Sequence, residues 1–244
     1  MNNILLRINL TNNSVSTEKM PESVVYDYLG GTGYITYYLN KELDPLIEPL
    51  SPENKIIIAP GPIQGTAVPV SGRYAVGTKS PLTGLYLDSN AGGFLGPEIR
   101  MAGYDLIIVE GSSSKPVYVS IKDEKVEIKD ATDLWGFFVY ETELMIRHLE
   151  EEPKMRIITI GPAGENLVNF ACTTSDSFRN AGRGGLGAVF GSKNLKAIAV
   201  KGSLNPSNGN PEKIKAVRED IIQRAKNAKD EGHLLHQHGT SWLV

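Results

Sequence analysis

Cysteine is almost absent from this chain of 244 residues. Cys172 is the single one, so the sequence encodes no internal disulfide, no four-cysteine cluster site and no cysteine-based structural zinc site. We expect Cys172 to be a small buried apolar residue. An excess of basic charge is missing too, because 25 lysines and arginines are offset by 28 acidic residues, and the net charge is −3. This balance leaves no electrostatic footprint for nucleic acid.

The sequence also lacks a long apolar run. No stretch approaches the roughly 20 apolar residues that a membrane-spanning helix needs. Residues 1–7 lack the basic region, apolar core and small-residue cleavage site of a signal peptide. We therefore expect a cytoplasmic protein that does not associate with membranes.

A catalytic nucleophile is not recognisable. There is no G-x-S-x-G serine, and His148 lies among charged residues of an expected helix. His233, His236 and His238 crowd the C-terminus, where we favour solvated histidines over a metal site, because a metal would need a fourth ligand and an ordered scaffold. The sequence predicts a ligand platform with no catalytic residue of its own.

Glycine, in contrast, is concentrated in one segment, where it would let the backbone bind a ligand. Between Gly182 and Gly191 the chain has five glycines, and Arg179 and Arg183 flank the first of them. Glycine permits positive φ and lets bare backbone approach a ligand, and the exposed N–H groups of such a turn bind anions. Arginine adds a planar fork suited to phosphate. We call residues 179–187 the second cradle and expect it to bind a large, flat, phosphorylated ligand.

An earlier segment is similar to this one. Asn90-Ala-Gly-Gly and Asn180-Ala-Gly each open a glycine-rich stretch of helical length that ends in an apolar strand, and the two lie 90 residues apart. Upstream, Ile56-Ile-Ile-Ala-Pro-Gly-Pro62 matches Ile157-Ile-Thr-Ile-Gly-Pro162. This spacing is too long for a solenoid, so we expect a duplicated half-domain. Residues 89–96 then form a first cradle, and a ligand with two similar phosphorylated arms fits the pair.

Two nucleotide-binding motifs resemble parts of this segment but do not fit it. Gly182-Arg-Gly-Gly-Leu-Gly187 matches the G-x-G-x-x-G string, but that fingerprint directly follows a strand and needs an acidic residue about 20 residues later. Here Ser175-Asp-Ser-Phe-Arg-Asn180 precedes it, and Gly202-Ser-Leu204 lies at that distance. Gly191-Ser-Lys193 has the wrong order for a P-loop. Neither motif is assigned.

We expect an α+β fold in two parts. Residues 1–203 should form an internally duplicated two-half sheet platform, and residues 204–244 a linker and the incomplete beginning of a helical second domain. Expected strands cover 4–10, 14–18, 55–59, 72–80, 84–89, 104–109, 115–122, 125–129 and 155–160, and expected helices 22–29, 33–43, 93–102, 139–151 and 212–229. The hairpin at 115–129 is expected on the surface.

Two expected helices carry apolar stripes. That of helix 139–151 includes Val139, Leu144, Ile146 and Leu149, and that of helix 212–229 includes Ile214, Val217, Ile221 and Ile222. The second stripe and Trp242-Leu-Val244 are expected to be poorly ordered or to pack on a neighbouring molecule, because the domain they would belong to is absent.

The chain resembles the N-terminal domain of the tungsten-containing aldehyde ferredoxin oxidoreductase family. The resemblance covers nearly all of residues 1–203 and weakens toward Val244. It rests on Leu50-Ser-Pro-Glu-Asn-Lys55, Gly72-Arg-Tyr74, Thr78-Lys-Ser-Pro-Leu-Thr-Gly84, Ser89-Asn-Ala-Gly-Gly93, Ala102-Gly-Tyr-Asp105, Ile160-Gly-Pro-Ala-Gly-Glu-Asn166 and Ala181-Gly-Arg-Gly-Gly-Leu-Gly-Ala188.

The resemblance implies a platform for a tungsten bis-pyranopterin (tungstopterin), with Mg²⁺ bridging the pterin phosphates. The implied cofactor-binding residues are Arg73, Asn90, Gly92, Arg179 and Asn180. Of these, Asn90 and Asn180 would ligate Mg²⁺ through their backbone carbonyls. The position of Asn180 is usually a small residue in the family, but a main-chain contact tolerates this change.

The resemblance also implies what lies elsewhere. The family's [4Fe–4S] cysteines, its acidic pterin contacts and its proton-transfer residues are expected beyond Val244, in further domains or a partner chain. The implied function is the cofactor platform of a tungsten or molybdenum aldehyde:ferredoxin oxidoreductase that oxidises aldehydes to carboxylates, and we expect the chain alone to be inactive and to hold little tungsten. Two alternatives stay open: a stand-alone, non-catalytic pterin-binding or carrier subunit, and a relative that acts on another carbonyl or a thioester.

Overall fold

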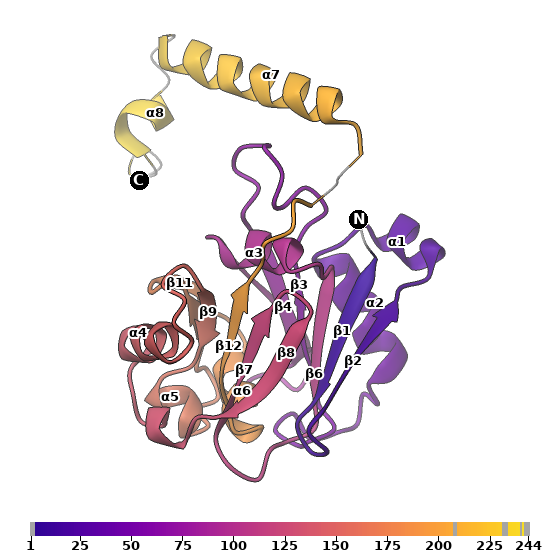
Figure 1. Ribbon diagram of the computed structural model, residues 1–244, viewed down its shortest axis with the longest axis vertical. Coiled ribbons are helices and arrows are strands. Elements are labelled where there is room, and N and C mark those ends of the chain that lie inside the picture. Colours follow the sequence, from indigo (N-terminus) through magenta and orange to yellow (C-terminus); the bar gives the residue numbers. More distant parts are fainter. Residues whose placement is uncertain (1–2, 207–208, 231–233, 240, 242–244) are drawn as a thin grey trace.

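Two six-stranded sheets and their covering helices make up most of the protein (Figure 1). The computed structural model describes residues 3–206, 209–230, 234–239 and 241. The first half contains β1 (Ile4–Asn9), β2 (Ser14–Lys19), α1 (Glu22–Tyr28), α2 (Thr32–Glu42), β3 (Ile56–Ala59), β4 (Tyr74–Lys79), β5 (Tyr86–Ala91), α3 (Leu95–Met101) and β6 (Leu106–Glu110). The second half contains β7 (Val117–Lys122), β8 (Lys125–Asp130), the 3₁₀ helix η1 (Thr132–Leu134), α4 (Val139–Leu149), β9 (Arg156–Thr159), α5 (Pro162–Glu165), β10 (Thr173–Ser175), β11 (Arg179–Ala181), α6 (Leu186–Ser192) and β12 (Leu195–Lys201).

The two halves share one topology. The first sheet has the order β2-β1-β6-β3-β4-β5, and the second, read from its other edge, has the order β8-β7-β12-β9-β10-β11. In each sheet one pair of strands is parallel, β1 with β6 and β7 with β12, and the other pairs are antiparallel. Every strand of the first half thus has a counterpart six strands later. The expected duplicated α+β platform is confirmed.

Alternating side chains divide the apolar residues into three layers. On β1, Leu6 belongs to a core between the sheets, whereas Leu5 belongs to a cluster under α1 and α2. On β12, Ile198 belongs to the same central core and Ala197 to a cluster under α4. The short helices α3 and α6 contribute to the central core, where α3 contacts β9 and β12, and α6 contacts β4. Each half therefore packs a helix on the sheet of the other half.

The hairpin of β7 and β8 is not a surface ribbon. We expected it on the surface, but β7 lies inside its sheet between β12 and β8, and five of its six residues are buried. Val117, Val119 and Ile121 enter the central core while Tyr118 packs under α4. Both faces of β7 are covered, so the alternation that suggested a surface strand reflects two different buried environments.

Helix α4 buries a different face from the one that its apolar residues predict. Ile146 is buried, but Leu144 and Leu149 are 48% and 54% exposed. Thr142 and Glu143 are fully buried instead. A buried glutamate needs hydrogen-bond partners that the sequence pattern does not reveal, and Glu143 finds them in Ser177, in the turn that precedes the second cradle, and in Arg147 on the same helix.

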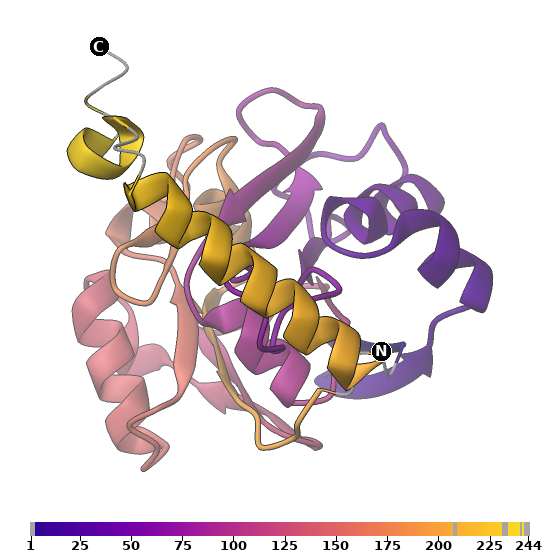
Figure 2. The ribbon, with the colours of Figure 1, turned by 90° about the horizontal axis from the view of Figure 1, so that it is seen from above.

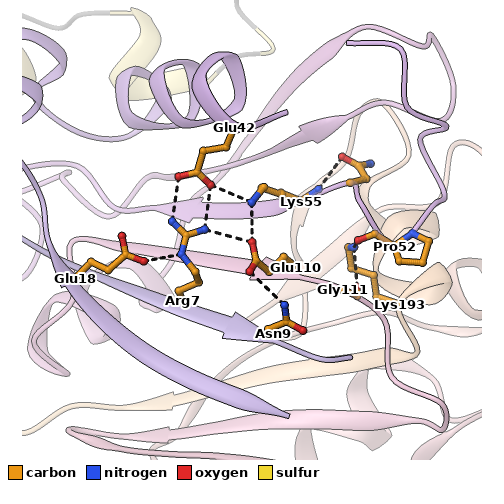
Figure 3. Close-up of polar contacts among 10 residues, drawn as sticks. Arg7, Asn9, Glu18, Glu42, Pro52, Lys55, Glu110, Gly111 and Lys193 are labelled. Carbon is orange, nitrogen blue, oxygen red and sulfur yellow. Dashed lines mark hydrogen bonds and ion pairs between the residues drawn. The ribbon is translucent and has the colours of Figure 1, made fainter. Parts of the chain in front are cut away.

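A charged cluster fixes the C-terminal end of α2 to the first sheet (Figure 3). The Arg7 guanidinium on β1 donates to both carboxylate oxygens of Glu42 at 3.0 Å each. Lys55 Nζ lies 2.9 Å from Glu42 and 2.6 Å from Glu110. Next to this cluster, the buried Lys193 ammonium donates to two backbone carbonyls, and burial lowers the pKa of Lys193 to about 8. A carboxylate at a helix C-terminus is disfavoured by the helix dipole, so these cations stabilise its position.

The second half uses the same arrangement at the end of α4. The Glu150 carboxylate is 1% exposed, accepts hydrogen bonds from Tyr118 at 2.7 Å and Lys129 at 2.9 Å, and pairs with Lys122 at 3.0 Å. Burial alone would raise the pKa of Glu150, but the hydrogen bonds from Lys129, Tyr118 and Lys122 lower it to about 2. Both covering helices are thus held by carboxylates at their C-terminal ends.

Helix α7 (Pro211–Asp230) and the short α8 (Leu234–His238) follow the platform. Figures 1 and 2 show α7 above the sheets, crossing the end of the platform that carries α3. Along the expected stripe, Val217 and Ile222 are exposed and Ile214 and Ile221 are half-buried. The expectation for Trp242-Leu-Val244 lies outside the described residues. The proposed domain boundary at 203/204 stays a prediction.

Glu150 predicts a specific loss of stability in acid. Its folded pKa lies below the ordinary value of 4.5, so it stabilises the fold above about pH 4.5, and this contribution is lost as the pH falls toward 2. We expect Glu150→Gln to unfold at lower urea concentration at pH 7 and to lose less of its stability than the wild type between pH 5 and pH 2. Urea titrations across this range measure both effects. Glu124→Gln is the control, because Glu124 is exposed; equal pH slopes for wild type and Glu150→Gln would contradict the assignment.

Candidate functional site

The two cradles meet where the sheets touch. β5 and β11 are edge strands of their sheets and contact each other. Asn90 on β5 pairs with Ala75, and Asn180 on β11 pairs with Thr174. In both halves, the alanine that follows the asparagine pairs with the first residue of the preceding strand. Asn90 and Asn180 therefore occupy equivalent positions on adjacent strands.

The hairpin of β10 and β11, which carries two of the expected site residues, was not predicted. Each strand is only three residues long, and they are joined through Asp176 and Ser177, both with positive φ. Three-residue strands are too short to show a periodic pattern. The Asn180-Ala-Gly sequence held the signal, because its counterpart Asn90-Ala-Gly directly follows an expected strand.

The turn of this hairpin is anchored on α4. Glu143 accepts a hydrogen bond from the Ser177 N–H at 2.7 Å and another from the Ser177 hydroxyl at 3.1 Å. Arg147, one helical turn later, pairs with Glu143 at 2.8 Å. Glu143 is buried because it supplies these bonds, and it holds the turn against the helix.

The same turn reaches into the first cradle. Asp176 accepts a hydrogen bond from the Phe94 N–H at 2.7 Å through Oδ2, and its Oδ1 lies 3.2 Å from the Arg156 guanidinium. The Arg156 guanidinium in turn lies 4.5 Å from the centre of the Phe94 ring. The sequence pattern indicates neither Asp176 nor Arg156 as a site residue, since their contacts with Phe94 join the two halves and appear only in the fold.

Further hydrogen bonds join the halves beside the cradles. The Tyr74 hydroxyl donates to Ser175 Oγ at 2.8 Å, and burial raises the pKa of Tyr74. Ser80 Oγ donates to the Gly184 carbonyl at 2.7 Å. These bonds fix the distance between the cradles from several directions.

Glycine is required at Gly93 for two reasons. Its φ is +109°, and a Cβ atom there would overlap Oδ2 of Asp176 and lie 3.3 Å from Cγ of Arg179. A Cβ atom on Gly72 would lie 2.5 Å from the Gly93 carbonyl oxygen. The backbone next to Arg73, the turn after Gly92 and the stem of Arg179 are therefore in close contact. Another side chain, Gln64, also donates to the Arg73 carbonyl from the loop after β3.

Three arginines at the cradles have no carboxylate partner. Arg73, Arg179 and Arg183 are exposed, and none has a carboxylate within ion-pairing distance in the described part of the chain. The Arg179 guanidinium lies over its neighbour Phe178, and the Arg183 N–H lies 3.4 Å from Ser89 Oγ. The other arginines of residues 3–206 are ion-paired: Arg7, Arg100, Arg147 and Arg156. The arginines of residues 3–206 that have no carboxylate partner thus all lie at or beside the cradles, as an anionic ligand requires.

The two expected arginines are not equivalent in the repeat. Arg73 directly precedes β4, and the residue that precedes β10 is Cys172. Arg179 stands one residue before Asn180, where β5 has Ser89. Arg73 and Arg179 therefore do not occupy equivalent positions of the internal repeat. Cys172 is a partly buried free thiol rather than a fully buried one.

Other site types find no support among the described residues. No group of three histidine, cysteine, aspartate or glutamate side chains is arranged to hold a metal in this part of the chain. His148 is exposed on α4, and His233 lies outside the described residues. No described helix has the length and apolarity to cross a membrane. A pocket of about 500 Å³ lies between α2 and the β4–β5 hairpin, lined by tyrosines, and contains none of the cradle residues.

Comparison with known proteins gives the family. The family model described as "Aldehyde ferredoxin oxidoreductase, N-terminal domain" matches residues 5–202. The tungsten-containing aldehyde ferredoxin oxidoreductase of Pyrococcus furiosus is 49% identical over 239 residues, which are 98% of this chain and 40% of that protein. The corresponding protein of Thermococcus kodakarensis is 48% identical, with the same coverage. The chain belongs to the aldehyde ferredoxin oxidoreductase family, and it spans about two fifths of the length of these relatives.

More distant relatives differ in their stated substrates. The aliphatic sulfonate oxidoreductase, WOR-like subunit, of Pyrococcus furiosus is 38% identical over 217 residues, covering 83% of this chain and 34% of that protein. The solved active site complex BamBC of benzoyl coenzyme A reductase matches with a TM-score of 0.92 and 37% identity, covering 94% of this chain and 35% of that one. The platform fold is shared across these proteins.

Gly93→Ala should separate backbone strain from steric overlap. The positive φ alone costs about 1–3 kcal/mol for a residue with a Cβ atom. Gly136→Ala is a matched control, because Gly136 has φ +94° and open space around its Cβ position. We expect Gly93→Ala to be less stable than Gly136→Ala in urea unfolding, and to speed hydrogen exchange at the Phe94 N–H by displacing Asp176. Equal stability of the two variants would contradict the close approach at Gly93.

Proposed function

We propose that this chain is the cofactor platform of a tungsten bis-pyranopterin aldehyde:ferredoxin oxidoreductase. The observation that carries the proposal is the gathering of three arginines without carboxylate partners around two glycine cradles, which equivalent strands bring together. A ligand with two phosphorylated arms matches this arrangement in charge and in symmetry. We take tungsten as the metal, an aldehyde as the substrate and ferredoxin as the electron acceptor from the names of the relatives.

The residues present fit such a cofactor. Arg73, Arg179 and Arg183 would bind its phosphates, and the backbone at Gly92 would lie against it. The main-chain carbonyls of Asn90 and Asn180 would ligate Mg²⁺, which needs oxygen ligands at about 2.1 Å in near-octahedral geometry. When bound, the tungsten would supply the two-electron oxidation of an aldehyde and water to a carboxylate. This chain would orient the cofactor and neutralise its phosphates.

The remainder of the chemistry belongs to other parts of the enzyme. We propose that an iron–sulfur cluster, the proton-transfer groups and the docking site for ferredoxin lie in segments that correspond to the rest of the relatives' length, and that the enzyme works in the cytoplasm. A platform without these segments would be inactive. This assignment accounts for the lack of a recognisable catalytic nucleophile in the sequence.

A second candidate function keeps the platform and changes the substrate. The likeness to an aliphatic sulfonate oxidoreductase subunit and to a benzoyl coenzyme A reductase favours it. The substrate does not touch this platform in our proposal, so assays must decide between the candidates. Reduction of ferredoxin or a viologen dye by the full-length enzyme with aldehydes, and its absence with aliphatic sulfonates and aromatic thioesters, would support the first function. Tight pterin binding with no activity on any of these would instead support the carrier alternative.

Removing the charge of Arg73 should release the cofactor. The experiment uses a full-length enzyme in which residues 1–244 are joined to the remaining part of the Pyrococcus furiosus relative. A hydrogen bond to a charged group contributes about 1.5–3 kcal/mol, so Arg73→Ala should weaken pterin retention about 10- to 100-fold. Tungsten by elemental analysis and pterin by fluorescence after release measure the effect.

The matched control is Arg218→Ala, which removes an exposed arginine on α7 that has no ion pair among the described residues. It should retain wild-type tungsten and pterin. Circular dichroism should show that Arg73→Ala is folded. Full cofactor content in a folded Arg73→Ala enzyme would contradict the proposed function.

A further inference from the structure

We infer that Asp176 is a positioning residue that sets the distance between the two cradles, and through them the geometry of the Mg²⁺ site. This inference rests on the proposed function. Asp176 would touch neither the cofactor nor the substrate. It would act through the backbone segments that carry Asn90 and Asn180.

The Asp176 carboxylate binds the two sides of the site with separate oxygens. Its side chain is 9% exposed. Oδ2 accepts the Phe94 N–H at 2.7 Å, and Oδ1 pairs with Arg156 of β9 at 3.2 Å. A carboxylate with both oxygens engaged has a fixed orientation. The Phe94 backbone, which lies four residues after Asn90, is therefore tied to the hairpin that carries Asn180.

The hairpin itself is held in a backbone conformation that non-glycine residues seldom adopt. Asp176 has φ +47° and Ser177 has φ +64°. Left-handed φ costs roughly 1–2 kcal/mol per residue with a Cβ atom. Such strain persists where the surroundings determine the conformation. Glu143 does so here, because it accepts both the N–H and the hydroxyl of Ser177 from the side of α4.

A continuous chain of contacts therefore runs from α4 to the first cradle. It passes from Glu143 to Ser177, then to Asp176, and then to the Phe94 N–H. Gly93 limits movement in the other direction. Oδ2 of Asp176 lies so close to the Gly93 backbone that a Cβ atom on Gly93 would overlap it. Movement of either cradle away from the other would break the Phe94 hydrogen bond, and movement toward it would overlap atoms.

The turn of the corresponding hairpin in the first half, residues 80–85, contains no carboxylate equivalent to Asp176. This hairpin of β4 and β5 pairs over six residues, from Tyr74 with Ala91 to Lys79 with Tyr86, whereas β10 and β11 pair over three. The turn of the longer hairpin lies at the far end of β4 from Arg73. The turn of the longer hairpin also contacts the opposite cradle, through the hydrogen bond from Ser80 Oγ to the Gly184 carbonyl at 2.7 Å, but this turn supplies no carboxylate. Asp176 is thus a feature of the second half that the repeat does not duplicate.

The distance between the two cradles is important because both would supply ligands to the same Mg²⁺ ion. Octahedral Mg²⁺ tolerates little distortion of its oxygen ligands. Removing a group that only orients metal ligands commonly weakens metal binding about 10- to 100-fold. If Asp176 sets the spacing of the two carbonyls, its substitution should weaken Mg²⁺ retention by that factor while the platform stays folded.

The competing explanation is charge. Asp176 is an anion among arginines, and it could act only by offsetting the charge of Arg156. Two variants separate position from charge. Asp176→Asn keeps one oxygen that can accept the Phe94 N–H, removes the charge and replaces the other oxygen by an NH₂ group, which cannot accept from Arg156. Asp176→Glu keeps the charge and moves the acceptor by one methylene.

The experiment measures two quantities. In the 244-residue chain without cofactor, hydrogen exchange at the Phe94 N–H reports the hydrogen bond. In the full-length enzyme joined to the Pyrococcus furiosus relative, Mg²⁺ and pterin are measured against increasing chelator, together with the electron paramagnetic resonance spectrum of tungsten. We expect Asp176→Glu to speed Phe94 exchange, weaken Mg²⁺ retention about 10- to 100-fold and change the tungsten spectrum. Asp176→Asn should stay within about threefold of the wild type.

The control is Asp27→Glu, at an exposed aspartate of α1, which should match the wild type in every measurement. The inference is overturned if Asp176→Asn keeps wild-type hydrogen exchange at the Phe94 N–H and yet weakens Mg²⁺ retention as much as Asp176→Glu does, since charge would then be the cause. It is also overturned if Asp176→Glu speeds Phe94 exchange but leaves Mg²⁺ retention unchanged. Failure of the proposed function is a different result: the Arg73→Ala enzyme then retains its cofactor, whatever the Asp176 variants do.

Discussion

The structure depends on the burial of two apolar sheet faces against each other. Neither sheet can bury its inner face alone, because its outer helices cover only the opposite face. The central core is completed by α3 and α6, which each contact strands of the other half. This packing fixes the relative orientation of the sheets, and it brings the edge strands β5 and β11 into contact. The two cradles therefore lie next to each other, because each begins at one of these edge strands.

Much of this arrangement could be predicted from the sequence. The repeated Asn-Ala-Gly segments and the matching strands at Ile56 and Ile157 revealed two halves, and the identical strand orders confirm them. The glycine-rich turn at residues 92–93 could be recognised as a place of close backbone approach, and at Gly93 the structure leaves no room for a Cβ atom. These inferences succeeded where one local sequence determines one local structure.

Other features could not be predicted, because they depend on contacts between distant segments. The strands β10 and β11 are too short for a periodic pattern, and they exist because β9 and α4 offer partners. Glu143 is buried in place of a leucine because Ser177, in the turn before the second cradle, and Arg147 supply its hydrogen bonds. Arg73 and Arg179 also stand at positions that the repeat does not relate, because their counterparts are Cys172 and Ser89. Family resemblance pointed to these arginines, but their lack of carboxylate partners is visible only in the fold.

The connection between the halves has a consequence for assembly. A single half would expose its inner face and would need a second copy to cover it, so its stability would rise with protein concentration. Residues 111–116 join β6 to β7 directly, and hydrogen bonds from Ser112 and Ser113 hold this segment to the end of α6. A short linker replaces the bulk concentration of a partner with an effective concentration in the millimolar range. The platform can therefore assemble at any dilution, and each half is free to diverge from the other, as the single Asp176 shows.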